Sequence, residues 1–159
     1  MTALALVLSY IEAMIPVNLG VPGAKLGLPN IVTMLALYTV GMRAAFSLGV
    51  LRIILVGLSF GNPFAAFYSF CGFLLSFAVM CLMKRSGAFG ILGVSTVGGV
   101  MHNVGQLFCA AYIVKTVYVF SYLFVLLPAG IAAGILIGIL GGMLTKRLKG
   151  VILEMTGDL

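Results

Sequence analysis

Three polar residues lie close together within a long apolar run. His102, Asn103 and Gln106 occur in the stretch MHNVGQLF, residues 101–108. On a helix, His102 and Gln106 share a face because they are four residues apart, and Asn103 lies about 100° further round. An apolar environment penalises polar groups that lack hydrogen-bond partners. This cluster is therefore a candidate either to line a polar cavity or to hydrogen-bond between helices.

Arg52 is a cation in the middle of another apolar run, LGVLRIILVG (48–57). A charge at mid-depth in a bilayer is costly, so an intramembrane ionisable residue is by default a functional-site hypothesis. The structural alternative is a buried ion pair with Glu12, the only acidic residue before position 154. The sequence leaves both interpretations open.

The chain lacks the motifs of common catalytic centres. It has no Walker-type GxxxxGK[ST] sequence, so it is not expected to hydrolyse ATP. One histidine and three acidic residues argue against a self-contained metal site. We therefore expect a binding protein rather than an enzyme, with no cofactor.

The composition predicts that a membrane surrounds these residues. Of 159 residues, 63% are hydrophobic and 8% are charged, whereas a soluble domain carries about 25% charged residues. The mean hydropathy is +1.28. We expect an all-helical membrane domain at 1–149 and a short cytoplasmic tail at 150–159. The net charge of +6 fits membrane topology better than nucleic-acid binding, because the basic residues lie in short loops and the tail.

Turn residues and charges divide the chain into six apolar segments. These predict a bundle of six transmembrane helices at about 2–15, 29–42, 44–60, 63–83, 88–114 and 119–145. A spanning helix needs about 20 residues. The last three segments reach that length, and the first three are short.

The basic residues predict the orientation. Six spans place both termini and the loops after the second and fourth segments on one side. That side collects six basic residues, namely Arg43, Lys84, Arg85, Lys146, Arg147 and Lys149, whereas the other collects only Lys25 and Lys115. Because basic residues favour the cytoplasmic side, both termini are predicted to be cytoplasmic, in a bacterial inner or plasma membrane. The loop at 16–28 is then external.

This orientation brings the polar residues to one level. Glu12 is near the outer end of the first segment, Asn30 opens the second from outside, and Arg52 is near mid-depth. The 101–108 cluster lies at mid-depth or just outside it. We predict an outward-facing substrate pocket, whose binding residues are Glu12, Lys25, Asn30, Arg52, His102, Asn103 and Gln106.

The residue types favour an anionic or electron-rich ligand group, which arginine and lysine side chains bind. Tyr38, Phe67 and Tyr68 are candidates to stack on a ring of the solute, and equally to face lipid or the core. In the sixth segment Gly130, Gly134, Gly138 and Gly142 recur every four residues, a pattern that predicts close helix packing. A weaker stripe of Ala5, Ser9 and Ala13 lies on the first segment.

Four stretches resemble the Gx transporter family, which is also named heptaprenyl diphosphate synthase component I. They are SYIEAMIP (9–16), PGAKLGLPNIVTMLALY (22–38), LRIILVGLSFGNP (51–63) and MHNVGQL (101–107). The most specific feature is PGAKLGLPNI followed by HNVGQ at this spacing. The resemblance extends over nearly the whole chain.

That family is similar to the substrate-binding S components of energy-coupling factor (ECF) transporters. The resemblance implies a six-helix subunit that captures a vitamin-like solute from outside, under a lid made by the first external loop. It also implies association with a scaffold subunit and two ATPases through small residues on the first helix. The lid residues would be Pro22, Gly23 and Gly27, and the docking stripe would be Ala5, Ser9 and Ala13.

The family's other name implies a part in making the prenyl side chain of menaquinone. Prenyl transfer uses aspartate-rich motifs that hold magnesium and diphosphate, and the only aspartate here is Asp158. The alternative function is thus a non-catalytic membrane component of heptaprenyl diphosphate synthase. A third interpretation is a structural membrane protein whose polar cluster only joins helices.

Overall fold

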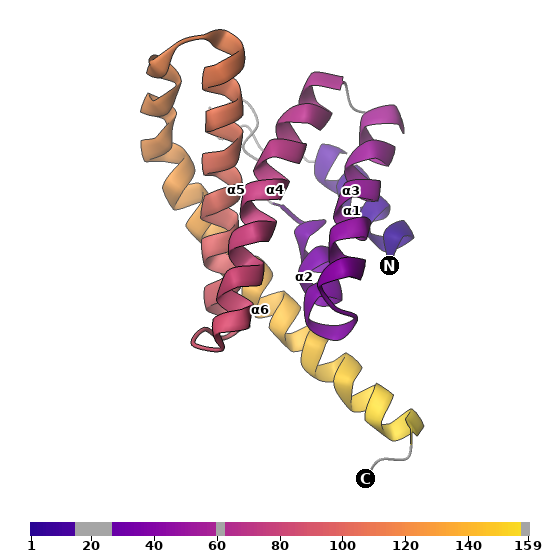
Figure 1. Cartoon of the computed structure of the whole chain (residues 1–159). Helices are drawn as coiled ribbons and strands as arrows, with labels where there is room; N and C mark the ends of the chain where they lie inside the picture. The colour runs from indigo at the N-terminus through magenta and orange to yellow at the C-terminus, as the bar shows by residue number, and fades with distance from the viewer. Residues whose placement is uncertain (15–26, 60–62, 157–159) are drawn as a thin grey trace.

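The computed structural model describes residues 1–14, 27–59 and 63–156, and every element in these ranges is helical (Figure 1). The helices are α1 (Thr2–Met14), α2 (Asn30–Thr39), α3 (Met42–Ser59), α4 (Pro63–Ser86), α5 (Ile91–Val114), a 3-10 helix η1 (Val117–Tyr122) and α6 (Leu123–Thr156). The six predicted segments each contain one α-helix. The last helix differs most, since it continues to Thr156 through much of the expected tail at 150–159.

Four helices, α3 to α6, are long and apolar enough to cross a membrane. Many of their large apolar side chains are exposed, including Leu58, Phe64 and Phe124. An apolar surface of this extent requires lipid rather than water around it, so the chain is a membrane protein. α1 and α2 have 13 and 10 residues, or about 20 and 15 Å of helix. Neither helix alone spans a hydrocarbon layer of about 30 Å.

Helix α2 lies in the interior of the bundle. It contacts α1, α3 and α6, and every residue from Ile31 to Leu37 is buried. The end of the helix is held by Lys84 of α4, whose Nζ donates to the Leu37 carbonyl and lies 4.9 Å from the centre of the Tyr38 ring. This bond satisfies one of the carbonyls that a helix C-terminus leaves without an intrahelical partner.

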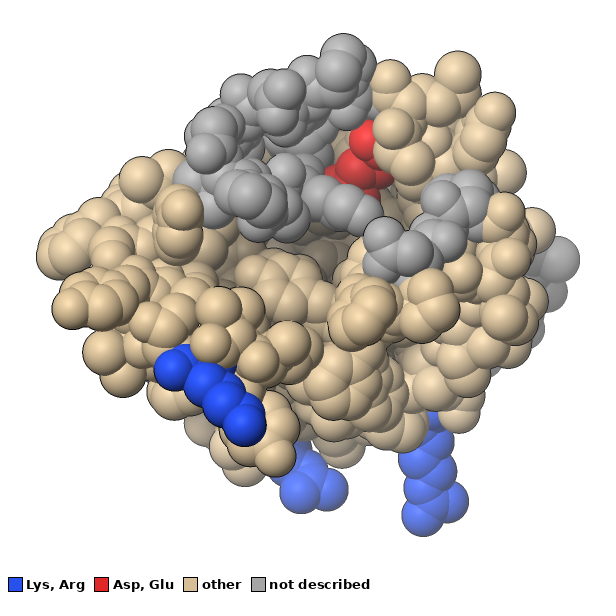
Figure 2. Space-filling model, turned by 90° about the horizontal axis from the view of Figure 1, so that it is seen from above, with Lys and Arg blue, Asp and Glu red and all other residues tan. Residues whose placement is uncertain are grey.

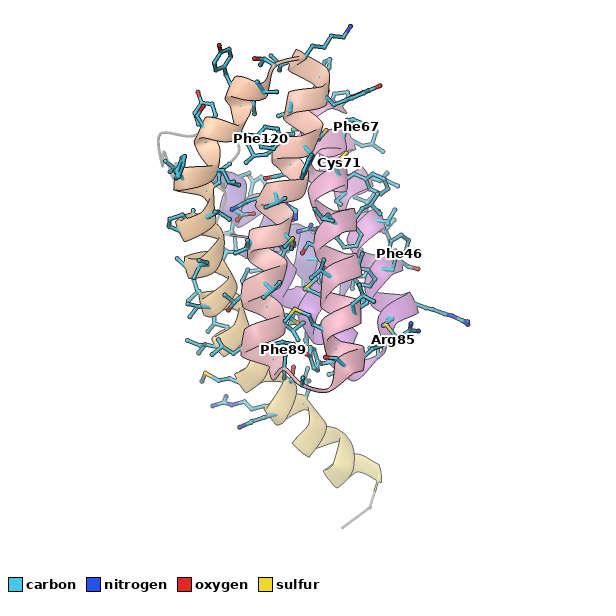
Figure 3. All side chains as sticks on the ribbon, turned by 60° about the vertical axis from the view of Figure 1, so that its left-hand side comes forward. Phe46, Phe67, Cys71, Arg85, Phe89 and Phe120 are labelled. Atoms are coloured by element: carbon cyan, nitrogen blue, oxygen red, sulfur yellow. The ribbon has the colours of Figure 1, made fainter. Side chains whose placement is uncertain are left out.

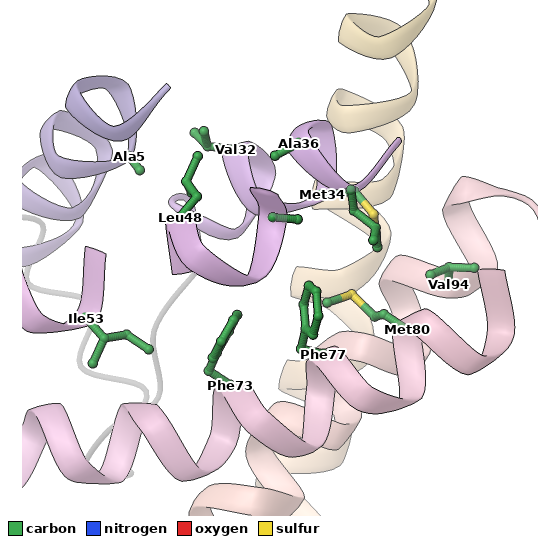
Figure 4. Close-up of a cluster of buried hydrophobic side chains, with 12 residues drawn as sticks. Ala5, Val32, Met34, Ala36, Leu48, Ile53, Phe73, Phe77, Met80 and Val94 are labelled. Atoms are coloured by element: carbon green, nitrogen blue, oxygen red, sulfur yellow. The ribbon is translucent and has the colours of Figure 1, made fainter. Parts of the chain in front are cut away.

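A compact core fills one half of the bundle. Side chains of α2, α3, α4 and α5 meet there, with Phe73, Phe77, Met80 and Val94 all buried (Figure 4). The rings of Phe73 and Phe77 have their centroids 5.4 Å apart. These residues lie toward the ends of α4 and α5 that the turn at 87–90 joins. This half of the bundle is therefore closed by packed apolar side chains.

Glycines bring α5 and α6 into backbone contact, as their four-residue spacing predicts. A Cβ at Gly134 would lie 2.6 Å from the Thr96 Cα, and one at Gly138 would lie 3.0 Å from the Leu92 Cα. Such distances leave no room for a side chain, so the two helix backbones touch. Gly142 differs, because its nearest neighbour would be a side-chain atom of Ile91 at 4.0 Å.

The two ends of the bundle carry different side chains. One end, which we call the basic end, holds Arg43, Lys84, Arg85, Lys146 and Arg147, near the turns after α2 and α4 and on the lower part of α6. The other, the tyrosine end, holds Lys115 and the exposed Tyr112, Tyr118 and Tyr122 around the turn into η1. Figure 3 places Arg85 and Phe89 at the basic end, and Phe67 and Phe120 toward the tyrosine end.

Replacing Gly134 by alanine tests the contact between α5 and α6. The added methyl group meets only backbone atoms of α5, so the helices must separate, and we expect a loss of about 1–3 kcal/mol. The matched control is Gly142→Ala, which has space for the methyl and gains helix propensity. Thermal unfolding in detergent should give a lower midpoint for Gly134→Ala only. Equal midpoints for the two variants would contradict the packing described.

Candidate functional site

A cavity of about 160 Å³ lies between the helices, and all six α-helices contribute to its wall. Six of the seven predicted binding residues line it: Glu12, Asn30, Arg52, His102, Asn103 and Gln106. The seventh, Lys25, lies outside the described residues, as do the predicted lid residues Pro22 and Gly23. The rest of the wall consists mainly of glycine, alanine and aliphatic side chains, with serines at Ser9 and Ser69.

The cavity lies in the half of the bundle nearer the tyrosine end. On α4 it is lined by residues of the first two turns, and the packed core around Phe73 and Phe77 follows further along the same helix. Figure 2 looks onto the tyrosine end and shows a hollow near its middle, with acidic atoms beside it and a basic side chain at the margin.

Arg52 projects from α3 into the interior and is 7% exposed. Its Nε has no hydrogen-bond partner among the described residues. A guanidinium carries five N–H donors in a planar fork that matches a carboxylate. Leaving a buried donor unpaired costs about 1–3 kcal/mol, so this position favours an acceptor that enters the cavity.

The side chain of Glu12 links the end of α1 by hydrogen bonds to the residues just before α2. Its Oε1 accepts the backbone N–H of Gly27 and that of Leu28, the latter at 3.3 Å. Gly27 has φ +73°, a conformation that glycine adopts readily, and its carbonyl accepts the Asn30 N–H at 2.8 Å. This arrangement places Asn30, the first residue of α2, on the cavity wall.

The charge of Glu12 also acts on Arg52, because both residues line the same cavity within electrostatic range. The sequence left open whether Arg52 pairs with Glu12 or with a ligand. In the structure Glu12 accepts the backbone N–H groups of Gly27 and Leu28, just before α2, and its negative charge acts on Arg52. The two residues are therefore the negative and positive groups of one cavity.

The polar residues of α5 divide into two kinds. Asn103 hydrogen-bonds between helices, since its Nδ2 donates to the Leu126 carbonyl of α6 at 2.7 Å. This contact matches the interhelical role weighed for intramembrane amides. His102 and Gln106 instead lie against α4 at Gly72, where an added Cβ would approach the His102 ring within 3.1 Å and the Gln106 Cγ within 2.8 Å.

Gly72 and Ser69 are functional candidates that the sequence did not indicate. Gly72 admits the side chains of His102 and Gln106, and Ser69 presents a hydroxyl to the cavity. Both lie on α4 among aromatic residues, FYSFCGF, where no four-residue stripe of small residues marks them. A single glycine or serine in such a run carries no sequence signal of its own.

Two of the three small residues of α1 face the interior. Ala5 is fully buried, and Ser9 is 8% exposed and donates to the Ala5 carbonyl at 2.8 Å. Ala13 is exposed and lies at the cavity, and docking through this stripe stays a prediction. The outward face of α1 carries large side chains, including Val7 and Tyr10.

Aromatic side chains are absent from the described residues that line the cavity. Tyr38, Phe67 and Tyr68, the candidates for stacking on a ring, all lie elsewhere. Tyr38 is beneath Lys84 near the end of α2, and Phe67 is 53% exposed on α4. Among the described lining residues, charge and hydrogen bonds are the main means of recognition, and the His102 imidazole is the one planar ring.

The chain matches one protein family over most of its length. The family model described as heptaprenyl diphosphate synthase component I matches residues 1–144, which include all the residues that line the cavity. No curated protein and no solved structure matches the chain significantly. The chain thus belongs to the heptaprenyl diphosphate synthase component I family, which is also called the Gx transporter family.

Proposed function

We propose that this protein is a substrate-binding membrane subunit, similar to an ECF S component, that captures a small solute from the external side of a bacterial cell membrane. The observation that carries the proposal is the buried Arg52, whose Nε has no partner among the described residues and which lines a cavity with five other polar residues. A carboxylate or similar acceptor entering the cavity would meet the guanidinium group of Arg52, which lines the wall.

The main structural alternative is that the polar residues only join helices. Asn103 does so, because it has an acceptor on α6. The same explanation does not extend to the Nε of Arg52, which is buried without an acceptor among the described residues. The cavity is lined by more polar residues than this one interhelical hydrogen bond requires, and a ligand site would account for the others.

The proposed topology has six crossings and cytoplasmic termini. The basic end would face the cytoplasm, because basic residues favour that side, and the tyrosine end would lie at the external interface, where tyrosine is enriched. The cavity would then open outward. Because the chain has no motif for ATP hydrolysis, uptake would require a scaffold subunit and ATPases as partners.

A second function is supported by the name of the family, heptaprenyl diphosphate synthase component I. Under it, the chain would be a non-catalytic membrane component of the synthase that makes the menaquinone side chain. The two functions differ in their partners, so they are separated by co-purification as well as by ligand binding.

Native mass spectrometry tests the ligand site. In protein extracted gently from its own membranes, we expect a small molecule to accompany the wild type and to be lost from Arg52→Gln, because the guanidinium anchors it. The matched control is Arg43→Gln on the same helix, since Arg43 is exposed at the basic end. Retention of the molecule in Arg52→Gln, or its loss from both variants, would contradict the assignment of Arg52.

Co-purification from the native host distinguishes the two functions. For a solute-binding subunit, we expect a membrane scaffold and ATPases to be recovered in fixed proportion with the tagged chain. Recovery of a soluble, aspartate-rich prenyltransferase in their place would support the synthase component. The measurement is quantitative proteomics against an unrelated membrane protein carrying the same tag.

A further inference from the structure

We propose that the solute is a small aliphatic zwitterion of the amino-acid type, bound with its carboxylate at Arg52 and its ammonium group at Glu12. This inference rests on the proposed function and names the class of its substrate. It is carried by the charges that line the cavity, by the cavity volume, and by the side chains that form the wall.

The charges of the cavity wall balance each other. Arg52 and Glu12 are the two charged residues that line it in the described part of the chain, and their formal charges sum to zero. A ligand with a net charge would leave an uncompensated charge in a medium of low dielectric constant, which is costly. A zwitterion supplies one charge of each sign and leaves the total at zero.

The placement of the two charges sets the orientation of the ligand. Arg52 is 7% exposed and lies on α3 deep in the bundle. The carboxylate end of the ligand would therefore enter the cavity first and bind the N–H donors of Arg52. Glu12 lies near the end of α1, where the backbone of Gly27 and Leu28 holds its Oε1. An ionised carboxylate accepts up to about four hydrogen bonds over its two oxygens, so these contacts are compatible with an ammonium group beside it.

The cavity volume restricts the ligand to a few non-hydrogen atoms. The volume of about 160 Å³ is close to that of an engineered cavity of about 150 Å³ that holds one benzene molecule. The part of a ligand held inside this space is therefore on the order of six to ten non-hydrogen atoms. Small amino acids and their β- and γ-amino homologues have this size.

The wall favours an aliphatic ligand. Glycine and alanine form much of it, and the described lining residues include no aromatic side chain that could stack on a ring. Asn30, His102 and Gln106 add groups that form hydrogen bonds to the polar ends of a ligand. An aromatic amino acid is larger than the space of about 160 Å³.

Matched ligands test the proposal on the purified chain in lipid nanodiscs. We expect at least one of L-alanine, β-alanine and γ-aminobutyrate to raise the thermal unfolding midpoint by several degrees at saturation. L-Lactate lacks the ammonium group of alanine and L-alaninamide lacks its carboxylate, so neither should produce the shift. L-Phenylalanine tests ring size, and O-phosphoserine tests excess negative charge.

Two substitutions test which residue binds the carboxylate of the ligand and which binds its ammonium group. Arg52→Gln should abolish the shift, whereas Glu12→Gln, which keeps an oxygen for the Gly27 N–H, should abolish the preference for an amino acid over its hydroxy-acid analogue. Arg43→Gln is the control. A shift with lactate, alaninamide, phenylalanine or phosphoserine, and not with the aliphatic amino acids, would overturn the zwitterion while leaving a solute-binding function. No shift with any compound would count against both.

Discussion

The burial of one guanidinium in an apolar bundle is the constraint on which the rest of the site depends. Arg52 is buried in an apolar bundle, so its charge and its donors must be met by groups that the fold supplies or admits. Glu12, Asn30, His102 and Gln106 gather around the same cavity. Together with Arg52 they come from four helices, so the site forms only when those helices are arranged as they are here.

Outside the cavity the helices of the bundle pack tightly against one another. Glycines bring α5 against both α4 and α6, and the aromatic core closes the half of the bundle nearer the basic end. The short α2 fills the interior, held at its start by Glu12 and at its end by Lys84. Space remains in the other half, where small residues of α3, α4 and α6 face the polar side chains.

The residues around the cavity were easier to predict from the sequence than the residues on the outer faces of the helices. The basic residues predicted the orientation of each segment in the membrane. That orientation placed Glu12, Asn30 and Arg52 at the same depth as His102. The direction of the α1 stripe was not predictable, because small residues such as Ala5 serve inward and outward packing equally. The bond from Glu12 to Gly27 was not predictable either, because it depends on how the chain returns between α1 and α2.

The central claim is that Arg52 serves a ligand rather than the fold, and the stability of the ligand-free Arg52→Met variant tests it most directly. Methionine fills a similar volume without charge. If Arg52 has no ion-pair partner in the ligand-free protein, its removal relieves the cost of burying an unpaired charge. We predict a thermal unfolding midpoint equal to or above that of the ligand-free wild type. A loss of about 3–5 kcal/mol, as expected when a buried ion pair is broken, would show instead that Arg52 is part of the structural framework.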